Sequence, residues 1–213
     1  MNQTRILIFT GGNLGLWALQ EIQSGDFLLG ADRGAMFLLN HGFCPDLALG
    51  DFDSVTPQQV NEIRQISKAF ESCDAVEKDQ SDTELAFDWA IRHIPKEIVL
   101  LGALGTRFDH SLANVHLLRT ALEHDIPCRI IDEYNEVILI NRHATLTKNR
   151  YTNVSLLPLT LEVTGITLHG FQYPLHQAAL RMGQSLAVSN ILVGETGEIE
   201  MSSGLLLVIQ SID

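Results

Sequence analysis

The sequence predicts an α/β domain with a mostly parallel sheet, followed by an antiparallel β-sandwich domain. Up to about residue 140, short apolar runs alternate with segments of helical periodicity, which is the pattern of βαβ units. Beyond that point the apolar runs are short and broken by turns, as in all-β domains. We therefore expect the α/β domain at residues 1–143 and the β-sandwich domain at residues 144–213.

The first strand is expected at residues 5–9, because this run is continuous, apolar and rich in β-branched side chains. Gly11 and Gly12 follow, and residues 14–22 have helical spacing. Glycine lets the backbone come close to a ligand, so strand, Gly-Gly and helix form the layout of a phosphate-binding turn. The complete dinucleotide and P-loop fingerprints are missing, and a plain tight turn is an equal alternative.

A second strand is expected at residues 27–31, followed by a helix that ends near residue 41. Asp32 stands just past the carboxyl end of this strand, where open α/β sheets bind ligands. An N-cap role for Asp32 in the following helix is equally consistent with the sequence, and the two roles are compatible.

The third strand, at residues 47–49, leads into Gly50, Asp51, Phe52 and Asp53. Alternate residues of an extended segment face the same way, so we expect the two carboxylates on one side and Phe52 toward the core. Carboxylates this close repel each other unless a cation or a proton lies between them, and an oxygen-only pair suits Mg²⁺. A solvated acidic turn is the alternative.

Another acidic junction follows a helix expected at residues 57–67 and a possible strand at 74–77. Lys78, Asp79 and Asp82 stand directly before or at the start of the next helix. A Ser-x-x-Glu capping box accounts for the start of that helix, but not for a cation and two carboxylates at one junction.

The loop after the strand expected at residues 97–101 combines glycines with an arginine. Gly105 exposes backbone N–H groups, and Arg107 offers a planar fork of donors suited to phosphate. Asp109 lies two residues on, and Asn114 could reach back from the following helix. A local ion pair between Arg107 and Asp109 is the alternative, but the neighbouring glycines favour phosphate binding.

The last strands of the first domain are expected at residues 128–131 and 137–140. Only residues 175–181 of the second domain could hold a helical turn. The apolar runs that predict its strands are residues 152–157, 160–164, 166–168, 185–188, 191–193, 198–201 and 205–209.

Composition limits the partners. The 14 basic and 26 acidic residues give a formal charge of −12, which argues against a nucleic-acid partner and against binding to an anionic membrane. The three cysteines are far apart and form no C-x-x-C, as expected for reduced thiols in the cytoplasm. No apolar stretch has the length needed to span a bilayer.

Four stretches of the chain form a motif series: residues 31–35, 45–54, 78–82, and 102–110 together with Asn114. In order and approximate spacing, this series resembles that of thiamine pyrophosphokinases. Residues 170–175 and 183–190 resemble the C-terminal signature of that family, so the resemblance covers nearly the whole chain. Arg33 and Ile191 depart from the pattern, because a small residue and an acidic residue are usual there.

The resemblance implies the reaction of ATP with thiamine to give AMP and thiamine diphosphate, with Mg²⁺. It also implies a homodimer whose active site draws on both subunits. By motif position it implies an acidic catalytic environment of Asp51, Asp53, Asp79 and Asp82, in which the first three are metal ligands and Asp32 belongs to the same cluster. It assigns the phosphates to Arg107, also a catalytic residue, and the support of the loop to Asp109 and Asn114. The thiamine pocket is matched by Ser189 and Asn190, while Gly11, Gly12 and Gly105 stay the candidate phosphate-binding glycines from the residues themselves.

Two alternatives remain. A different Mg²⁺-dependent transferase could act on a related hydroxyethyl substrate, or a non-catalytic sensor of thiamine or nucleotide could use the same scaffold. The acidic residues together with Arg107 favour an enzyme over a sensor, because a binder needs no such concentration of metal ligands.

Overall fold

The computed structural model describes residues 4–72 and 80–213 of the chain. Contacts divide the chain into two compact units, Met1–Glu133 and Tyr134–Asp213, which we call the first and the second unit. Within the described ranges, no helix is long and apolar enough to cross a membrane.

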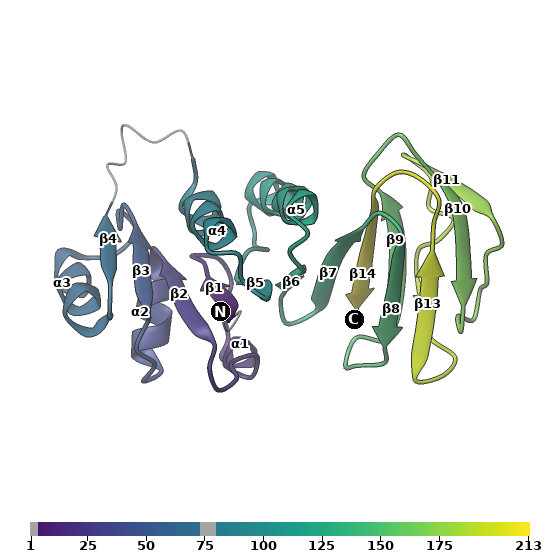
Figure 1. The fold of residues 1–213 in the computed structure, drawn as a ribbon. Helices are drawn as coiled ribbons and strands as arrows, with labels where there is room; N and C mark the ends of the chain where they lie inside the picture. The colour runs from purple at the N-terminus through teal and green to yellow at the C-terminus, as the bar shows by residue number, and fades with distance from the viewer. Residues whose placement is uncertain (1–3, 73–79) are drawn as a thin grey trace. The chain divides into compact units, whose positions relative to one another are not determined.

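A parallel sheet forms the centre of the first unit, with its strands in the order β6-β5-β1-β2-β3-β4 (Figure 1). The chain builds outward from β1 in both directions, so the carboxyl ends of β1 and β5 flank the point where the strand order reverses. The predicted parallel sheet is confirmed. The strands are β1 (Arg5–Phe9), β2 (Phe27–Ala31), β3 (Leu47–Gly50), β4 (Phe70–Ser72), β5 (Glu97–Leu101) and β6 (Cys128–Ile131).

Helices cover both faces of this sheet. α2 and α3 contact each other, as do α4 and α5, and the two pairs lie on opposite faces (Figure 1). A capping box and a proline in the first turn start α3, and the Ser81 hydroxyl caps α4 by accepting from the Glu84 N–H. The helices are α1 (Leu16–Leu19), α2 (Arg33–Asn40), α3 (Pro57–Ile66), α4 (Asp82–Arg92) and α5 (Phe108–Glu123).

Two local expectations need adjustment. The helix expected at residues 14–22 is limited to α1, and beyond it the N–H groups of Glu21 and Ile22 make turn hydrogen bonds to the Ala18 and Leu19 carbonyls. The chain then leaves the helical path, since the Glu21 carbonyl accepts from Arg5 and the Gln23 N–H donates to Asp26. The possible strand at residues 74–77 lies outside the described residues.

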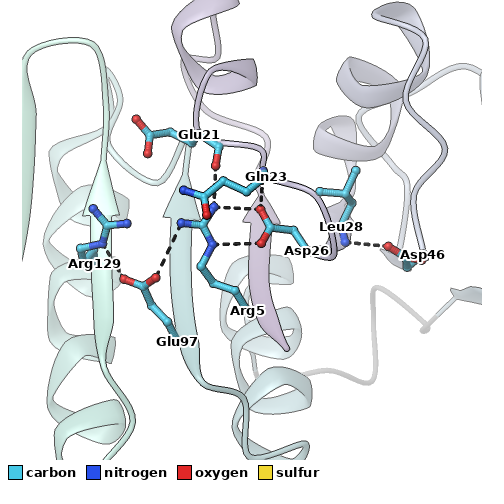
Figure 2. A network of polar contacts seen from close by, with 8 residues as sticks. All are labelled: Arg5, Glu21, Gln23, Asp26, Leu28, Asp46, Glu97 and Arg129. Atoms are coloured by element: carbon cyan, nitrogen blue, oxygen red, sulfur yellow. Dashed lines mark hydrogen bonds and ion pairs between the residues drawn. The ribbon is translucent and has the colours of Figure 1, made fainter. Parts of the chain in front are cut away.

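A charged network joins the amino ends of the strands (Figure 2). The Arg5 guanidinium, at the start of β1, donates to both oxygens of Asp26, over 3.0 and 2.8 Å. Glu97, at the start of β5, lies 3.8 Å from Arg5 and accepts from Arg129 of β6 over 2.7 Å. The network therefore ties β1, β5 and β6 to the entry of β2, at the edge opposite to the strands' carboxyl ends.

The second unit consists of two antiparallel sheets whose side chains share one hydrophobic core, which confirms the predicted sandwich. One sheet has the order β12-β9-β14-β7 and the other β11-β10-β13-β8. The core includes Val154, Leu156 and Val208 from the first sheet and Val163, Ile166 and Ile199 from the second. The strands are β7 (Asn135–Ile140), β8 (His143–Thr147), β9 (Asn153–Pro158), β10 (Glu162–His169), β11 (Ala178–Arg181), β12 (Asn190–Ile191), β13 (Thr196–Glu200) and β14 (Leu206–Ser211).

Three segments expected from the sequence pattern differ in this unit, and one of them, the run at residues 185–188, forms a turn and not a strand. β7, which the pattern assigned to the first domain, pairs along its whole length with β14 of the second unit. Residues 178–181, where a helical turn was considered, form β11 and pair with β10.

Candidate functional site

The carboxyl ends of β1, β2, β3 and β5 and the starts of α4 and α5 surround a cavity of about 580 Å³, which we call the acidic cavity. Asp109 does not line it, Asp79 lies outside the described residues, and Ser189 and Asn190 belong to the second unit. The residues expected from the sequence that do line it are Gly11, Gly12, Asp32, Asp51, Asp53, Asp82, Gly105, Arg107 and Asn114.

Three carboxylates converge in this cavity. Asp32, Asp51 and Asp53, which we call the acidic cluster, each offer an oxygen within 4.8 Å of the others. The Asp53 N–H donates to Asp51 Oδ1 over 3.1 Å. Phe52 between them has a positive φ of 57° and is buried, with its ring 4.8 Å from that of Phe70. A left-handed residue, and not the extended path we expected, therefore turns Phe52 into the core.

Asp32 is the most enclosed member of the cluster, with 8% of its surface exposed. It precedes α2, but its side chain makes no capping hydrogen bond. Its Oδ2 accepts from the Ser54 hydroxyl, whereas its buried Oδ1 has no hydrogen-bond partner. Burial, reinforced by the charges of Asp82 and Asp53, raises the pKa of Asp32 above its ordinary value.

This arrangement fits an oxygen-ligated cation. A buried carboxylate oxygen without a partner is costly, and here it lies beside two further carboxylates. Mg²⁺ binds through one or two carboxylates and completes its coordination with water and phosphate oxygens. The acidic cluster therefore meets the chemical requirements of such a site.

Asp82, the first residue of α4, supports the loop that carries the cluster. Its Oδ1 accepts the N–H of Asp51 over 3.2 Å. Gly50 has a φ of 147°, and a Cβ at this position would lie 3.0 Å from that oxygen and 3.3 Å from the Asp32 nitrogen. Glycine is needed here, since a side chain would press on both acidic residues.

The turn after β1 closely approaches the loop after β5. A Cβ at Gly12 would lie 2.0 Å from the Gly102 carbonyl oxygen, whereas a Cβ at Gly11 would meet nothing closer than 3.7 Å. The Gly11 carbonyl accepts from Arg33 Nη2 over 2.8 Å. The two glycines therefore have different structural roles: Gly12 permits the close approach of two loops.

In the loop after β5, Arg107 and Asp109 form the local ion pair considered as an alternative. Arg107 donates through Nε and Nη2, over 3.2 and 2.6 Å, and both side chains are exposed. The guanidinium lowers the pKa of Asp109 to about 2. Arg107 also lines the acidic cavity, and a guanidinium has five N–H donors, so the ion pair does not prevent phosphate binding.

Two side chains of α5 hold this loop. The Ser111 hydroxyl accepts from the Gly105 N–H over 3.0 Å and donates to the Arg107 carbonyl over 3.1 Å. Asn114 is buried and donates to the Ala103 carbonyl over 2.7 Å. The loop is therefore anchored to the helix at both ends.

In the second unit, Asn190 is buried, and both the oxygen and the nitrogen of its side-chain amide form hydrogen bonds within the chain. Its Oδ1 accepts from the N–H groups of Tyr173 and Ile191, over 3.0 and 2.9 Å, and its Nδ2 donates to the Tyr173 carbonyl over 2.7 Å. Ser189 is exposed, has a φ of 59°, and donates its N–H to Ser155. Asn190 thus positions the neighbouring segment, while the Ser189 side chain faces solvent.

Sequence reasoning missed three contributors to this site. Ser54 binds Asp32, Ser111 holds the arginine loop, and Arg33 bridges to the turn after β1. Ser54 directly follows the Asp-x-Asp stretch, which is a usable signal. Nothing local in the sequence indicates the partners of Ser111 and Arg33.

Comparisons with known proteins agree along the chain. A family model described as thiamin pyrophosphokinase, catalytic domain, matches residues 18–130, and one described as thiamin pyrophosphokinase, vitamin B1 binding domain, matches residues 140–206. The chain is 34% identical to a thiamine pyrophosphokinase of Bacillus subtilis over 187 residues, 87% of each protein.

Solved structures give the same result. The crystal structure of thiamine pyrophosphokinase from Bacillus subtilis matches with a TM-score of 0.91 and 31% identity, covering 99% of this chain and 100% of that one. The structure of thiamin pyrophosphokinase from Geobacillus thermodenitrificans matches with a TM-score of 0.88 and 34% identity, covering 99% and 98%.

Proposed function

The chain belongs to the thiamine pyrophosphokinase family of enzymes, and we propose that it transfers the pyrophosphoryl group of ATP to thiamine. The products are thiamine diphosphate and AMP. The observation that carries this proposal is a single cavity lined by both the acidic cluster and Arg107. Pyrophosphoryl transfer needs this combination, because the triphosphate must be positioned and its charge offset.

In the proposed reaction, the hydroxyethyl oxygen of thiamine attacks the β-phosphorus of ATP in line. The bond from the β-phosphorus to the bridging oxygen breaks, and AMP leaves with the electron pair. Arg107 offsets charge on the transferred group. A carboxylate takes the hydroxyl proton. Asp82 and Asp79 are the candidates for this base, the latter outside the described residues.

We propose Asp32, Asp51 and Asp53 as the residues that hold Mg²⁺, and Asp79 stays a predicted fourth carboxylate. The support is the spacing of the cluster's oxygens and the unpartnered Oδ1 of Asp32. When bound, Mg²⁺ supplies charge neutralisation of the triphosphate. Asp82 contributes by supporting the Asp51 backbone.

We also propose a homodimer in the cytoplasm, with thiamine bound near Ser189. The support for the dimer is a set of exposed apolar side chains in the second unit. Three of them lie on segments 170–173 and 190–193, which hydrogen-bond to each other, and two lie on the turn at 185–188. Sedimentation equilibrium tests it, and a monomer at all concentrations would refute it. The exposed apolar residues are Tyr173, Leu186, Val188, Ile191 and Val193.

The experiment that tests the reaction is a product analysis. The purified protein is incubated with MgATP and thiamine, and the nucleotides and thiamine esters are resolved. We expect AMP and thiamine diphosphate in equal amounts, and no AMP without thiamine. ADP in place of AMP would indicate transfer of a single phosphoryl group. Thiamine binding without nucleotide turnover would favour a sensor.

A further inference from the structure

Ser54 links the two loops that carry the acidic cluster. It directly follows Asp53 in the segment between β3 and α3, whereas Asp32 follows β2. The Ser54 hydroxyl donates to Asp32 Oδ2, across a separation of 22 positions in the chain. This hydrogen bond therefore joins the loop that presents Asp32 to the loop that presents the other two carboxylates of the cluster.

The main chain of Asp32 is fixed without the help of its side chain. Its N–H donates to the Leu49 carbonyl of β3 over 3.0 Å, and its carbonyl accepts from the Ala35 N–H of α2 over 3.1 Å. Its positive φ of 49° is disfavoured for a residue with a side chain, so these contacts hold it there. The direction of the carboxylate then depends only on the side-chain torsions, which a hydrogen bond to one oxygen can fix.

The loop that presents Ser54 is anchored in the core. Phe52 is buried, and its ring stacks on that of Phe70 in β4. The Val55 N–H donates to the Phe52 carbonyl over 3.4 Å, which closes a turn around Ser54. Thr56 then caps α3. Ser54 therefore lies between a buried ring and a capped helix, and its hydroxyl has a defined place from which to hold a partner.

The two oxygens of Asp32 have different surroundings. Oδ2 accepts from Ser54, whereas Oδ1 is buried and has no hydrogen-bond partner within the described ranges. A buried carboxylate oxygen normally has a partner, because leaving it without one costs free energy. Asp32 also offers an oxygen within 4.8 Å of oxygens of Asp51 and Asp53, where a shared cation would be such a partner. The bond from Ser54 thus commits one oxygen of Asp32 and leaves the other for an ion.

We propose that Ser54 is a positioning residue for the metal ion: it holds Asp32 so that Oδ1 binds the ion, and it does so before ATP arrives. The role of this ion in the reaction rests on the proposed function, and the inference adds the residue that prepares the site. Ser54 acts through Asp32 and not by contact with the ion. Hydrogen-bond partners of metal ligands fix the orientation of the ligand, and their loss typically costs about 10–100-fold in metal affinity.

Metal binding without substrates measures this role directly. Mn²⁺ prefers the same oxygen ligands as Mg²⁺, and it is titrated into the protein without ATP or thiamine and followed by electron paramagnetic resonance. Wild type should bind Mn²⁺, and Ser54→Ala should weaken the affinity by about 10–100-fold. Ser54→Thr keeps the hydroxyl and should bind nearly as wild type does. Ser111→Ala is the matched control and should also keep the affinity for Mn²⁺, because Ser111 lines the same cavity but bonds to the loop after β5.

A double-mutant cycle separates positioning from a direct effect on the ion. Asp32→Asn removes the charge of the ligand at nearly constant size, and asparagine tolerates a positive φ. This variant should itself bind Mn²⁺ more weakly. In its background, Ser54→Ala should cause no further loss, because the oxygen that Ser54 holds is no longer a charged ligand. Ser54→Cys has a weaker donor of similar size, and it replaces Ser54→Ala if urea unfolding shows that the alanine variant does not fold.

Three results would overturn the proposal: unchanged Mn²⁺ affinity in Ser54→Ala, losses that add in the double variant, or a wild-type protein that binds no Mn²⁺ without ATP. The product analysis with MgATP and thiamine is a separate measurement, so none of these results would refute the proposed function. Conversely, Mn²⁺ binding that depends on Ser54, in a protein that makes no thiamine diphosphate, would refute the proposed function and retain this role of Ser54.

Discussion

Replacing Gly12 by alanine should push apart the two loops that meet at the carboxyl ends of β1 and β5. The new Cβ would lie 2.0 Å from the Gly102 carbonyl oxygen and 3.1 Å from its carbonyl carbon. Ordinary contact begins at about 3.4 Å, so the oxygen would have to move by about 1.4 Å. Both partners are backbone, and neither can rotate away as a flexible side chain could.

The movement has consequences for both stability and turnover. Overpacking of this kind typically costs about 1–3 kcal/mol, and the lower chain entropy of unfolded alanine offsets about 0.4–1 kcal/mol of it. We therefore expect the free energy of unfolding to fall by about 1–2 kcal/mol. Displacement of a site loop by about 1 Å can reduce turnover by about 10²-fold.

Urea unfolding and the rate of thiamine diphosphate formation measure the two effects. Gly11→Ala is the matched control for stability, because its Cβ would meet Asp32 Oδ2 at an ordinary 3.7 Å. We expect the control to be as stable as wild type or slightly more stable. Equal stability of the two alanine variants would refute the close-approach argument for Gly12.

Three further outcomes are expected. Arg107→Ala should lower turnover by about 10²–10³-fold while the protein stays folded. Arg119→Ala breaks a similar exposed ion pair of α5 and should leave turnover unchanged. Near-normal turnover in Arg107→Ala would remove Arg107 from the mechanism. Asp109 should remain ionised at pH 3 in an NMR titration, because its pKa is lowered to about 2, and Arg107→Gln should return it toward the ordinary 3.8. The stabilising effect of that ion pair is therefore present above about pH 4 and lost as the pH falls through about 2; an unchanged Asp109 titration in the variant would contradict this. Asp26→Asn should lower the free energy of unfolding, measured in urea, by about 2–3 kcal/mol, because the enclosed Arg5 loses its main partner (Figure 2). Turnover should stay near normal. Unaltered stability would mean that the charged network contributes little.

Local patterns were sufficient for the first unit's class of fold. Helical periodicity and apolar runs alternate along the chain, and this alternation depends only on neighbouring residues. The edge at which Asp32, Asp51 and Arg107 lie also follows, because the carboxyl ends of parallel strands share one edge. Strand order does not follow, since many orders are compatible with the same alternation. Only the tertiary structure therefore shows that the turn after β1 and the loop after β5 face each other where the strand order reverses.

The backbone conformation at the acidic cluster also could not be predicted from the sequence. The Asp-x-Asp spacing predicted two neighbouring carboxylates, but Phe52 adopts a left-handed conformation that its residue type does not favour. Its burial against Phe70 from the neighbouring strand stabilises that turn. The partners of Asp82 and Ser54 likewise come from segments distant in the chain.

The sequence by itself determined the two fold classes, the family, and the residue types gathered at the carboxyl edge of the sheet, because periodicity and motif spacing are local properties. Tertiary structure alone decided which of them meet. It set the different roles of Gly11 and Gly12, the enclosed carboxylate of Asp32, and the hydrogen bond that Ser54 donates to it. These depend on distances between chain segments that only the packed sheet brings together.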